Sequence, residues 1–398
     1  MPHRIAILGS TGSIGVNALH VIEHLGAPHR AVGLSAHRHK ERLLAQVHRF
    51  RPAAVAISDA AVAGELAGPI AQANARLYGG ESGLVDLVRR DDIDTVLSAV
   101  VGAAGLPAAL AAVSTGKRLA LANKESLVVA GSLLIPEARR RGATIIPVDS
   151  EHSAVFQAMQ CGRASEVKRV ILTASGGPFR DASLEQIQSA TVADALNHPT
   201  WRMGTKITID SATMFNKALE LIEACWLFDI APEKIRIVIH PESVVHSMVE
   251  FVDGSVIAQL SPPDMKTPIQ YALTYPHRSA GCGRVMDWEA AFSLQFRPPD
   301  VERFPAIRLA YAVAQAGGTA GAVLNAANEA AVAAFIAGRI RFGEICGVVE
   351  RTIDAHRLQS QPGLDDLLAA DQWAREKAAE LVEQTTTSAR PMHTGQPA

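Results

Sequence analysis

The sequence contains few cysteines and no long apolar run. Four cysteines in 398 residues, Cys161, Cys225, Cys282 and Cys346, lie far apart and form no CxxC pair. This spacing argues against a disulfide framework or a zinc knuckle and indicates thiols that are kept reduced. No apolar stretch is long enough to span a bilayer, which argues against a membrane partner. Because a strand-like segment begins at Arg4, we expect no targeting peptide before it and a cytoplasmic location.

The sequence also lacks an excess of charge of either sign. Its 38 Lys and Arg against 40 Asp and Glu give a formal charge of −2, which argues against a nucleic-acid partner. Apolar residues at 48% and charged residues at 20% are ordinary for a globular protein. Because one hydrophobic core rarely organises a chain this long, we expect two or three domains.

Residues 1–149 alternate short aliphatic or β-branched runs with amphipathic stretches. This alternation predicts βαβ units, and hence an α/β fold that begins with a Rossmann-like parallel sheet covered on both faces. The expected strands are Arg4–Leu8, Ala31–Ser35, Ala53–Ser58, Thr95–Val100, Arg118–Ala122 and Thr144–Val148, with Ala75–Tyr78 as an added edge strand.

The pattern changes after residue 149. Val167–Thr173, Lys206–Asp210 and Ile235–His240 are typical of strands, and Asp253-Gly254 marks a hairpin, which together predict a central α+β domain. After this domain the chain is first rich in Pro, Gly and Arg, which is typical of a linker. It then becomes Ala-rich with a helical pattern, and its last residues are polar. The expected parts are a nucleotide-binding domain 1–149, a central domain 150–277, a linker 278–303, a C-terminal helical domain 304–383 and a disordered tail 384–398.

A glycine-rich turn follows the first expected strand. In "RIAILGSTGSIG", Gly9, Gly12 and Gly15 separate this strand from an amphipathic helix. Such glycines let the backbone approach a pyrophosphate, and the helix N-terminus offers free N–H groups to it. The strand–turn–helix–strand context favours a dinucleotide site over a turn without a ligand.

The end of the second expected strand indicates which dinucleotide binds. NAD-selective domains place an acid there for the ribose hydroxyl, whereas this chain has His37, Arg38 and His39. These basic residues favour the 2′-phosphate of NADP(H). An ordinary solvated helix start is the alternative interpretation.

Two carboxylates follow the sixth expected strand in "TIIPVDSEHSAVFQ". Ligands of parallel nucleotide-binding sheets collect at this edge. In an extended backbone Asp149 and Glu151 face the same way and repel each other, unless a hard cation such as Mg²⁺ or Mn²⁺ lies between them. Solvated carboxylates that cap the next helix are an equal alternative for this pair alone.

A third carboxylate favours the cation. In "TIDSATMFNKALELIEACWLF", a strand end is expected to precede a long helix capped by Asp210 or Ser211. Asn216, Lys217 and Glu220 then share one helix face. A surface salt bridge between Lys217 and Glu220 explains that pair. It does not explain Ser211, Asn216 and Lys217 at a helix start, where phosphate binds well.

Three further segments are candidate parts of the same site. "TASGGPF" offers Ser175 beside two flexible glycines, and "NHPTWRMGTK" carries His198, Trp201 and Met203 on a glycine-bounded loop that suits a water-excluding lid. The alternative is a Trp201 docked in the core. In "NKES", Lys124 begins a helix and points into the same crevice or into solvent.

These segments, in this order and with "HPESVVHSMVEF" and "NAANE", closely resemble the 1-deoxy-D-xylulose 5-phosphate reductoisomerase family over about residues 4–380. The resemblance implies an NADPH-binding domain, a central catalytic domain that carries the contact of a homodimer, and a C-terminal helical domain. It also implies the isomerisation of 1-deoxy-D-xylulose 5-phosphate and its reduction by NADPH to 2-C-methyl-D-erythritol 4-phosphate, in non-mevalonate isoprenoid synthesis.

The resemblance also implies roles for individual residues. The divalent cation's ligands are Asp149, Glu151 and Glu220. The catalytic residues are Lys124, Glu151, His198 and Glu220. The substrate contacts are Lys124, Ser150, Glu151, Ser175, His198, Trp201, Met203, Ser211, Asn216, Lys217 and Glu220. The cofactor contacts that the resemblance implies are Thr11, Gly12, Ser13, Ile14, Asn123, Glu125 and Gly204, and the basic end of the second expected strand adds His37, Arg38 and His39. One departure is that His37-Arg38-His39 stands where the family often has Gly-Lys/Arg-Asn.

Two rival functions follow from the same residues. Another NADP-dependent oxidoreductase, such as a semialdehyde dehydrogenase, needs a nucleophilic cysteine in a polar setting, which Cys161 lacks. A catalytically silent NADPH sensor would have no use for three candidate cation ligands and Lys217.

Overall fold

The computed structural model describes residues 3–388, and the chain forms two compact units. The first unit comprises Met1–Ala174 and Glu223–Arg297, and the second comprises Ser175–Ile222 and Pro298–Ala398. The division at residue 222 falls inside one continuous helix, α11 (Phe215–Phe228). The expected three-domain boundaries remain a prediction, whereas the α/β class is confirmed.

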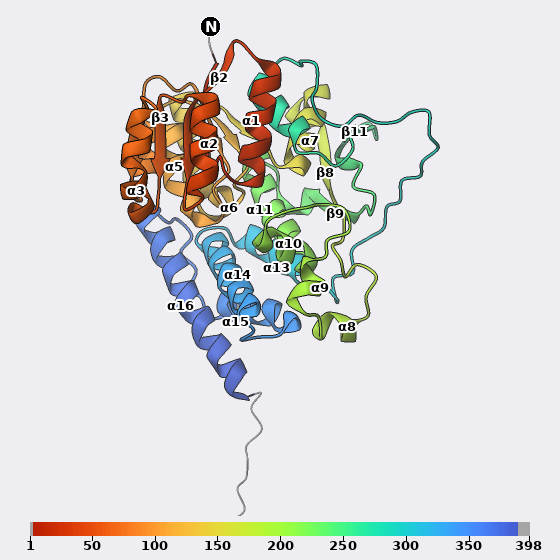
Figure 1. The fold of residues 1–398 in the computed structure, drawn as a ribbon. Coiled ribbons are helices and arrows are strands. Elements are labelled where there is room, and N and C mark those ends of the chain that lie inside the picture. Colours follow the sequence, from red (N-terminus) through yellow and green to blue (C-terminus); the bar gives the residue numbers. More distant parts are fainter. Residues whose placement is uncertain (1–2, 389–398) are drawn as a thin grey trace, which may run out of the picture. The chain divides into compact units, whose positions relative to one another are not determined.

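The first unit contains a seven-stranded parallel sheet (Figure 1). Its strands lie in the order β4-β3-β2-β1-β5-β6-β7. Their bounds are β1 His3–Leu8, β2 His29–Ala36, β3 Ala54–Ile57, β4 Arg76–Gly79, β5 Thr95–Ser98, β6 Arg118–Leu121 and β7 Ile145–Pro147. All six expected strands and the added edge strand are confirmed. Both β1 and β7 therefore deliver their carboxyl ends to the same edge of the sheet, where nucleotides and substrates bind in such folds.

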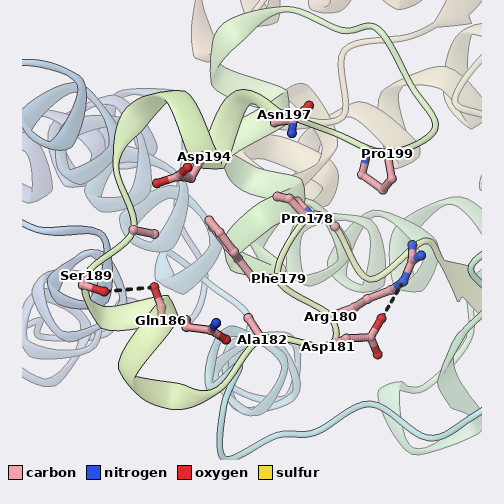
Figure 2. Close-up of a pocket in the computed structure, with 12 residues that line it drawn as sticks. Pro178, Phe179, Arg180, Asp181, Ala182, Gln186, Ser189, Asp194, Asn197 and Pro199 are labelled. Atoms are coloured by element: carbon pink, nitrogen blue, oxygen red, sulfur yellow. Dashed lines mark hydrogen bonds and ion pairs between the residues drawn. The ribbon is translucent and has the colours of Figure 1, made fainter.

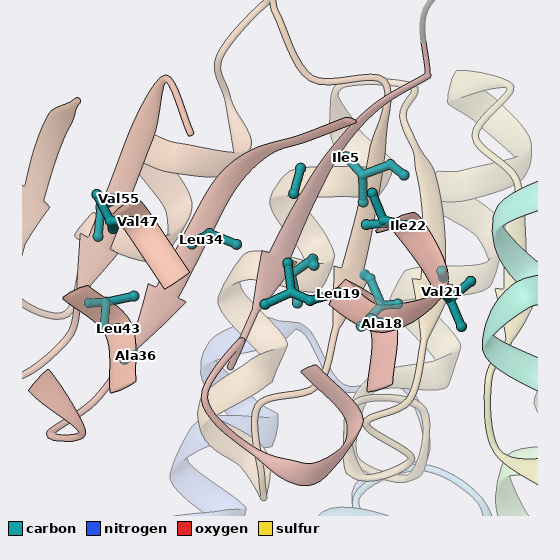
Figure 3. Packing of buried hydrophobic residues seen from close by; sticks show 14 of the residues in the cluster. Ile5, Ala18, Leu19, Val21, Ile22, Leu34, Ala36, Leu43, Val47 and Val55 are labelled. Carbon is teal, nitrogen blue, oxygen red and sulfur yellow. The ribbon is translucent and has the colours of Figure 1, made fainter. Parts of the chain in front are cut away.

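Helices cover the faces of this sheet. The intervening helices are α1 Ser13–Leu25, α2 Lys40–Phe50, α3 Ala60–Gln72, α4 Gly83–Val88, α5 Leu106–Ser114 and α6 Glu125–Arg141. On one face, Leu19 of α1 and Leu43 of α2 pack with Ile5 and Leu34 of the strands (Figure 3). Each such buried aliphatic side chain contributes about 1.5–3 kcal/mol. This apolar layer supports the loops at the edge of the sheet.

The first unit also contains a four-stranded sheet, in the order β11-β10-β8-β9. Its strands are β8 Val167–Ala174, β9 Ile235–Ile239, β10 Val245–Phe251 and β11 Val256–Leu260. Helix α7 Ser150–Ala158 packs against β10 and β11, whereas α12 Lys266–Thr274 packs against α1 and the strands β6 and β7 of the parallel sheet. The expected hairpin at Asp253-Gly254 is confirmed as β10–β11. The expected linker contains no helix or strand over residues 278–297, apart from a bridge between Arg297 and Ile239.

The second unit is helical. Its helices are α8 Leu184–Gln188, α9 Val192–Leu196, α10 Thr205–Thr213, the first part of α11, α13 Ala306–Ala316, α14 Ala320–Ile336, α15 Ile345–Asp354 and α16 Leu364–Ser388. The expected strand Lys206–Asp210 is wrong, because this segment lies in α10. Its β-branched Ile-Thr-Ile run is typical of a strand, but burial of Thr208 and Ile209 in helical packing overrides that propensity.

The C-terminal end also differs from expectation. Helix α16 continues to Ser388, so the first residues of the expected disordered tail are helical. The rest of that tail, from residue 389, lies outside the described residues. Among the described helices, none combines the length and apolar character needed to cross a membrane.

Candidate functional site

The glycine turn has the geometry that a pyrophosphate site requires. A Cβ on Gly9 would lie 2.7 Å from the Ala99 carbonyl oxygen, and a Cβ on Gly15 would lie 2.4 Å from the Gly9 oxygen. Gly12 is the N-cap of α1 and supplies no side-chain acceptor to the helix N–H groups. Gly12 and Ser13 are exposed. A dinucleotide phosphate therefore fits this turn, because no side chain caps the start of α1, where the first helical N–H groups lack intrahelical partners.

Polar side chains hold this turn in place through hydrogen bonds. The sequence did not identify them. Ser35 Oγ accepts a hydrogen bond from the Gly9 N–H at 2.9 Å. Gln46, buried in α2, donates to the Ser10 carbonyl at 2.8 Å and accepts from the Ser10 hydroxyl at 2.7 Å. Arg42 donates to the Thr11 carbonyl at 2.8 Å. The signal in the sequence was Gln46, a polar residue on the apolar face of the amphipathic helix α2.

The basic residues after β2 are exposed, as a 2′-phosphate site requires. His37 Nδ1 lies 3.0 Å from Ser58 Oγ, and Arg38 Nε donates to Asp59 Oδ2 at 2.7 Å. Asp59 also caps α3, because its other oxygen accepts from the Ala61 and Val62 N–H groups. Asp59, directly after the neighbouring strand β3, thus places a carboxylate beside Arg38. The sequence did not predict this contact.

The remaining candidate cofactor contacts lie in two places. Asn123 is buried and donates to Glu125 Oε2 at 2.7 Å and to the Gly102 carbonyl at 3.0 Å. Gly204 belongs to the second unit, where it is the N-cap of α10. Its role in cofactor binding therefore stays a prediction.

The carboxylates after β7 are arranged differently from the expected extended pair. Asp149 is the N-cap of α7, and its Oδ1 accepts from the Glu151 N–H at 3.3 Å. Glu151 lies in the first helical turn, where the Ser150 hydroxyl donates to its Oε2 at 2.5 Å. The expected extended backbone is wrong, since the chain becomes helical at Ser150. The expected convergence is confirmed, because carboxylate oxygens of Asp149 and Glu151 lie within 4.8 Å of each other. The capping alternative is correct for Asp149, and it does not exclude a cation.

A buried ion pair holds Asp149. Lys124 Nζ lies 2.6 Å from Asp149 Oδ2, and both side chains are nearly enclosed, with 6% and 11% of their surfaces exposed. Burial acts to raise the pKa of the Asp149 carboxyl. The Lys124 ammonium and His152 outweigh it, so this pKa lies well below its usual value. The Asp149 carboxyl is therefore ionised at neutral pH, as an oxygen ligand of a hard cation must be.

Further titratable side chains surround this pair. His152 Nδ1 lies 3.6 Å from Asp149 Oδ1 and 3.3 Å from Glu223 Oε2, and ligand atoms of these three residues lie within 4.8 Å of one another. The buried His246 is oriented by the Ser261 carbonyl oxygen, 3.1 Å from its Nε2. Sequence reasoning missed Glu223, although an acid inside the apolar run of α11 was a signal.

In the second unit, Ser175, His198 and Ser211 converge as expected. His198 Nε2 lies 3.1 Å from each of the two serine hydroxyl oxygens. Its Nδ1 accepts the Thr200 and Trp201 N–H groups at 3.1 and 2.9 Å, so the neutral ring carries its proton on Nε2. The ring therefore donates to a serine and leaves the serine hydroxyls able to donate to an anion.

One of the two glycines expected beside Ser175 is required by its backbone conformation and by a close contact. Gly177 adopts φ +68°, and a Cβ there would lie 2.6 Å from the Ser211 carbonyl oxygen. The Gly177 N–H also donates to Ser175 Oγ at 3.2 Å. The glycine therefore permits the close approach that brings Ser175 to Ser211.

The start of α11 carries the third carboxylate. Asn216 donates to Glu220 Oε1 at 2.6 Å, and Lys217 forms an ion pair with Glu220 Oε2. The Lys217 and Glu220 side chains are 3% and 1% exposed, so the surface salt bridge considered above is wrong. The expected capping by Asp210 or Ser211 is also wrong, because both residues lie in α10 and α11 begins at Phe215.

The expected lid segment, residues 197–204, contains no helix or strand. Trp201 and Met203 are partly buried and Arg202 is exposed, so Trp201 is not a fully buried core residue. A hollow of about 620 Å³ lies beside this segment and is lined by Phe179, Arg180 and Pro199 among others (Figure 2). None of the predicted site residues lines it.

The fold and these two clusters define a dinucleotide-binding α/β oxidoreductase. Family models of the 1-deoxy-D-xylulose 5-phosphate reductoisomerase match residues 5–131, its C-terminal-domain model matches residues 145–228, and the DXP reductoisomerase C-terminal domain matches residues 260–377. The chain belongs to the 1-deoxy-D-xylulose 5-phosphate reductoisomerase family.

Relatives of that name match almost the whole chain. The protein from Pelodictyon phaeoclathratiforme is 49% identical over 379 residues, which are 95% of this chain and 99% of the relative. The protein from Pseudomonas aeruginosa is 47% identical over 386 residues, or 95% and 98% of the two chains.

Solved structures give the same result. The Zymomonas mobilis enzyme in complex with NADPH has a TM-score of 0.90 at 43% identity, covering 96% of this chain and all of that chain. A DOX-P reductoisomerase in complex with NADPH, fosmidomycin and magnesium has a TM-score of 0.90 at 42% identity, covering 96% and 98%. The rival interpretations as a semialdehyde dehydrogenase or a silent sensor are therefore not supported.

His198 yields a pH prediction. Burial, and then the Arg180 charge, lower its pKa from 6.5 to about 4. Because the unfolded chain gains this proton near pH 6.5 and the folded chain does not, stability should fall as the pH drops from about 6.5 to about 4. NMR titration of the labelled imidazole should show a midpoint near 4, and Arg180→Gln should raise it. Arg202→Gln, on the same loop, is the control. A wild-type midpoint near 6.5 would contradict the assignment.

Proposed function

We propose that the chain converts 1-deoxy-D-xylulose 5-phosphate to 2-C-methyl-D-erythritol 4-phosphate, using NADPH and a divalent cation. The observation that carries this proposal is the ionised, buried Asp149 beside Glu151, at the same sheet edge as the glycine turn. A nucleotide site and a hard-cation site at one edge suit a reaction that rearranges an oxygen-rich substrate and then reduces it. The family relatives and their complexes with NADPH and magnesium support the same reaction.

The cation's ligands are proposed to be Asp149, Glu151 and Glu220. Asp149 is the N-cap of α7, and Glu151 lies in the first turn of the same helix. Glu220 stands one turn before Glu223 on α11, and Glu223 lies 3.3 Å from His152, the neighbour of Asp149. When bound, a divalent cation would chelate a carbonyl and an adjacent hydroxyl oxygen and lower the cost of negative charge that develops there. Magnesium is present in related structures, and manganese is proposed as an alternative because it also favours oxygen ligands.

The chain's own side chains have distinct tasks in this reaction. Lys124 keeps Asp149 in place and, with Ser150 and Glu151, is proposed to bind the reacting end of the substrate. Ser175, His198, Ser211, Asn216 and Lys217 are proposed to bind its phosphate. The neutral His198 helps here, because its Nε2–H supports a serine hydroxyl that donates to the anion.

The lid is proposed to keep the intermediate from water. Trp201 and Met203, between Pro199 and Gly204, would close over the substrate and retain an aldehyde until the hydride arrives from NADPH. The phosphate, remote from the reacting carbons, supplies binding energy that can be used for this closure.

The cation assignment predicts a specific loss in Asp149→Asn. The new amide oxygen can still accept the Glu151 N–H, but the negative charge is lost, so turnover should fall by more than about 100-fold. The variant should still fold, with a lowered melting temperature because the buried Lys124 loses its counter-charge. A chelator should abolish wild-type activity and leave NADPH binding largely intact, and Mg²⁺ or Mn²⁺ should restore the activity. Asp253→Asn is the control, because Asn-Gly suits the β10–β11 turn equally well. Full turnover in Asp149→Asn, measured as NADPH oxidation, would remove Asp149 from the cation site.

The 2′-phosphate site is proposed to include Arg38, flanked by His37 and His39. The Arg38 side chain is 73% exposed, and its contact with Asp59 engages Nε. Arg38→Ala should therefore weaken NADPH binding by about tenfold and leave NADH binding nearly unchanged, since a charged hydrogen bond is lost only with the phosphate. Arg49→Ala, another exposed and ion-paired arginine, serves as control. Equal losses for the two cofactors in fluorescence titrations would refute this role.

The chain is also proposed to form a homodimer in the cytoplasm. Val285 and Trp288, in the segment without helix or strand, are 85% and 71% exposed, and a second copy of the chain would cover them. Sedimentation should give twice the chain mass of 42.2 kDa, and a 42.2 kDa species at micromolar concentration would contradict it. The four free cysteines fit a reducing compartment, which cell fractionation tests.

A further inference from the structure

Asp210 is a buried carboxylate in the second unit that the proposed reaction leaves without a task. It lies in α10 and is 1% exposed. Its Oδ2 lies 2.5 Å from Lys206 Nζ, one turn earlier in the same helix. Its Oδ1 accepts a hydrogen bond from Asn328 Nδ2 at 2.9 Å. Asn328 is fully buried in α14, within the "NAANE" segment.

The bond between Asn328 and Asp210 joins two helices that are distant in sequence. The two residues are 118 positions apart, and both belong to the second unit. A buried carboxylate must be satisfied by donors, and a hydrogen bond to a charged group is among the stronger ones. Loss of the Asn328 donor would therefore change where α10 can lie against α14.

The position of α10 matters because its last turn carries part of the phosphate cluster. Ser211 follows Asp210 directly, and its hydroxyl lies 3.1 Å from His198 Nε2. The next turn is strained: Met214, a buried non-glycine residue, adopts the left-handed conformation with φ +64°. Such a conformation persists only when the surrounding structure holds it. Asn216 and Lys217 come immediately after this turn, so the anchor before it helps set the angle between the two groups of phosphate donors.

We propose that Asn328 is a positioning residue for the substrate's phosphate. Together with Lys206, it holds the Asp210 carboxylate, and this fixes the α10–α11 turn so that Ser211 on one side and Asn216 and Lys217 on the other face one phosphate. The inference rests on the proposed function and extends it to the C-terminal helices.

The test compares two buried asparagines of α14. Asn328→Leu keeps the approximate size and removes the donor to Asp210. Asn325→Leu is the matched control, because Asn325 is equally buried but donates to Glu329 of its own helix. Asn328→Leu should raise KM for 1-deoxy-D-xylulose 5-phosphate and the inhibition constant of inorganic phosphate by about tenfold or more. NADPH affinity should stay within about twofold, and Asn325→Leu should leave the phosphate constants unchanged even if it lowers the melting temperature to a similar extent.

A double variant in which the carboxylate and the amide exchange positions distinguishes the loss of this hydrogen bond from a general folding defect. In the double variant Asp210→Asn, Asn328→Asp, the donor and acceptor exchange places, and the phosphate inhibition constant should return toward the wild-type value. Unchanged phosphate constants in a folded Asn328→Leu, or a parallel loss of NADPH affinity, would overturn the inference. So would a double variant no better than Asp210→Asn alone. If the wild type fails to turn over the substrate, the proposed function fails. The phosphate-induced rise in melting temperature would then still separate Asn328→Leu from Asn325→Leu.

Discussion

A carboxylate that is almost fully removed from water must be paired, and Asp149 meets this condition at the end of β7. Lys124 supplies the charge, and His152 and Glu223 complete the surroundings. Removing one partner of a buried pair costs about 3–5 kcal/mol, a large share of the ~5–15 kcal/mol that stabilises a domain. Lys124, at the start of α6, faces inward because its ammonium group balances the buried charge of Asp149, 25 positions later in the chain. The pair adds little net stability, and its effect is to hold an ionised carboxylate, the proposed cation ligand, at the edge of the sheet.

The second unit follows the same rule with different residues. Glu220 is enclosed by Lys217 and Asn216, and Asp210 by Lys206 and Asn328. Buried ion pairs of this kind contribute position more than stability, because the cost of desolvation offsets much of the attraction. Each pair is completed by an asparagine amide, which supplies a donor without adding charge. The side chains of the proposed phosphate site are therefore oriented by a polar network and by helix packing together.

Both proposed anion sites rely on neutral donors as well as on cations. The start of α1, after the glycine turn, offers backbone N–H groups that no side chain caps, and His198 stays neutral because burial and Arg180 lower its pKa. A neutral ring with a defined tautomer orients two serine hydroxyls without requiring a counter-charge. Donors that are already in place lose little entropy on binding, so such sites can favour an anion without a large excess of positive charge. This is consistent with a chain whose formal charge is only −2.

The sequence by itself determined the parallel sheet, the glycine turn, and the acids and serines that carry the proposed chemistry. Periodicity and turn residues act over a few positions, so they can be read locally. The same local reading failed at Lys206–Asp210, where β-branched residues are helical because packing buries them. Only the tertiary structure decided that Arg38 meets Asp59 and that Asp210 meets Asn328, 118 positions away. Such pairings leave no local pattern, because they depend on how whole helices and strands pack and on which buried charges that packing must satisfy.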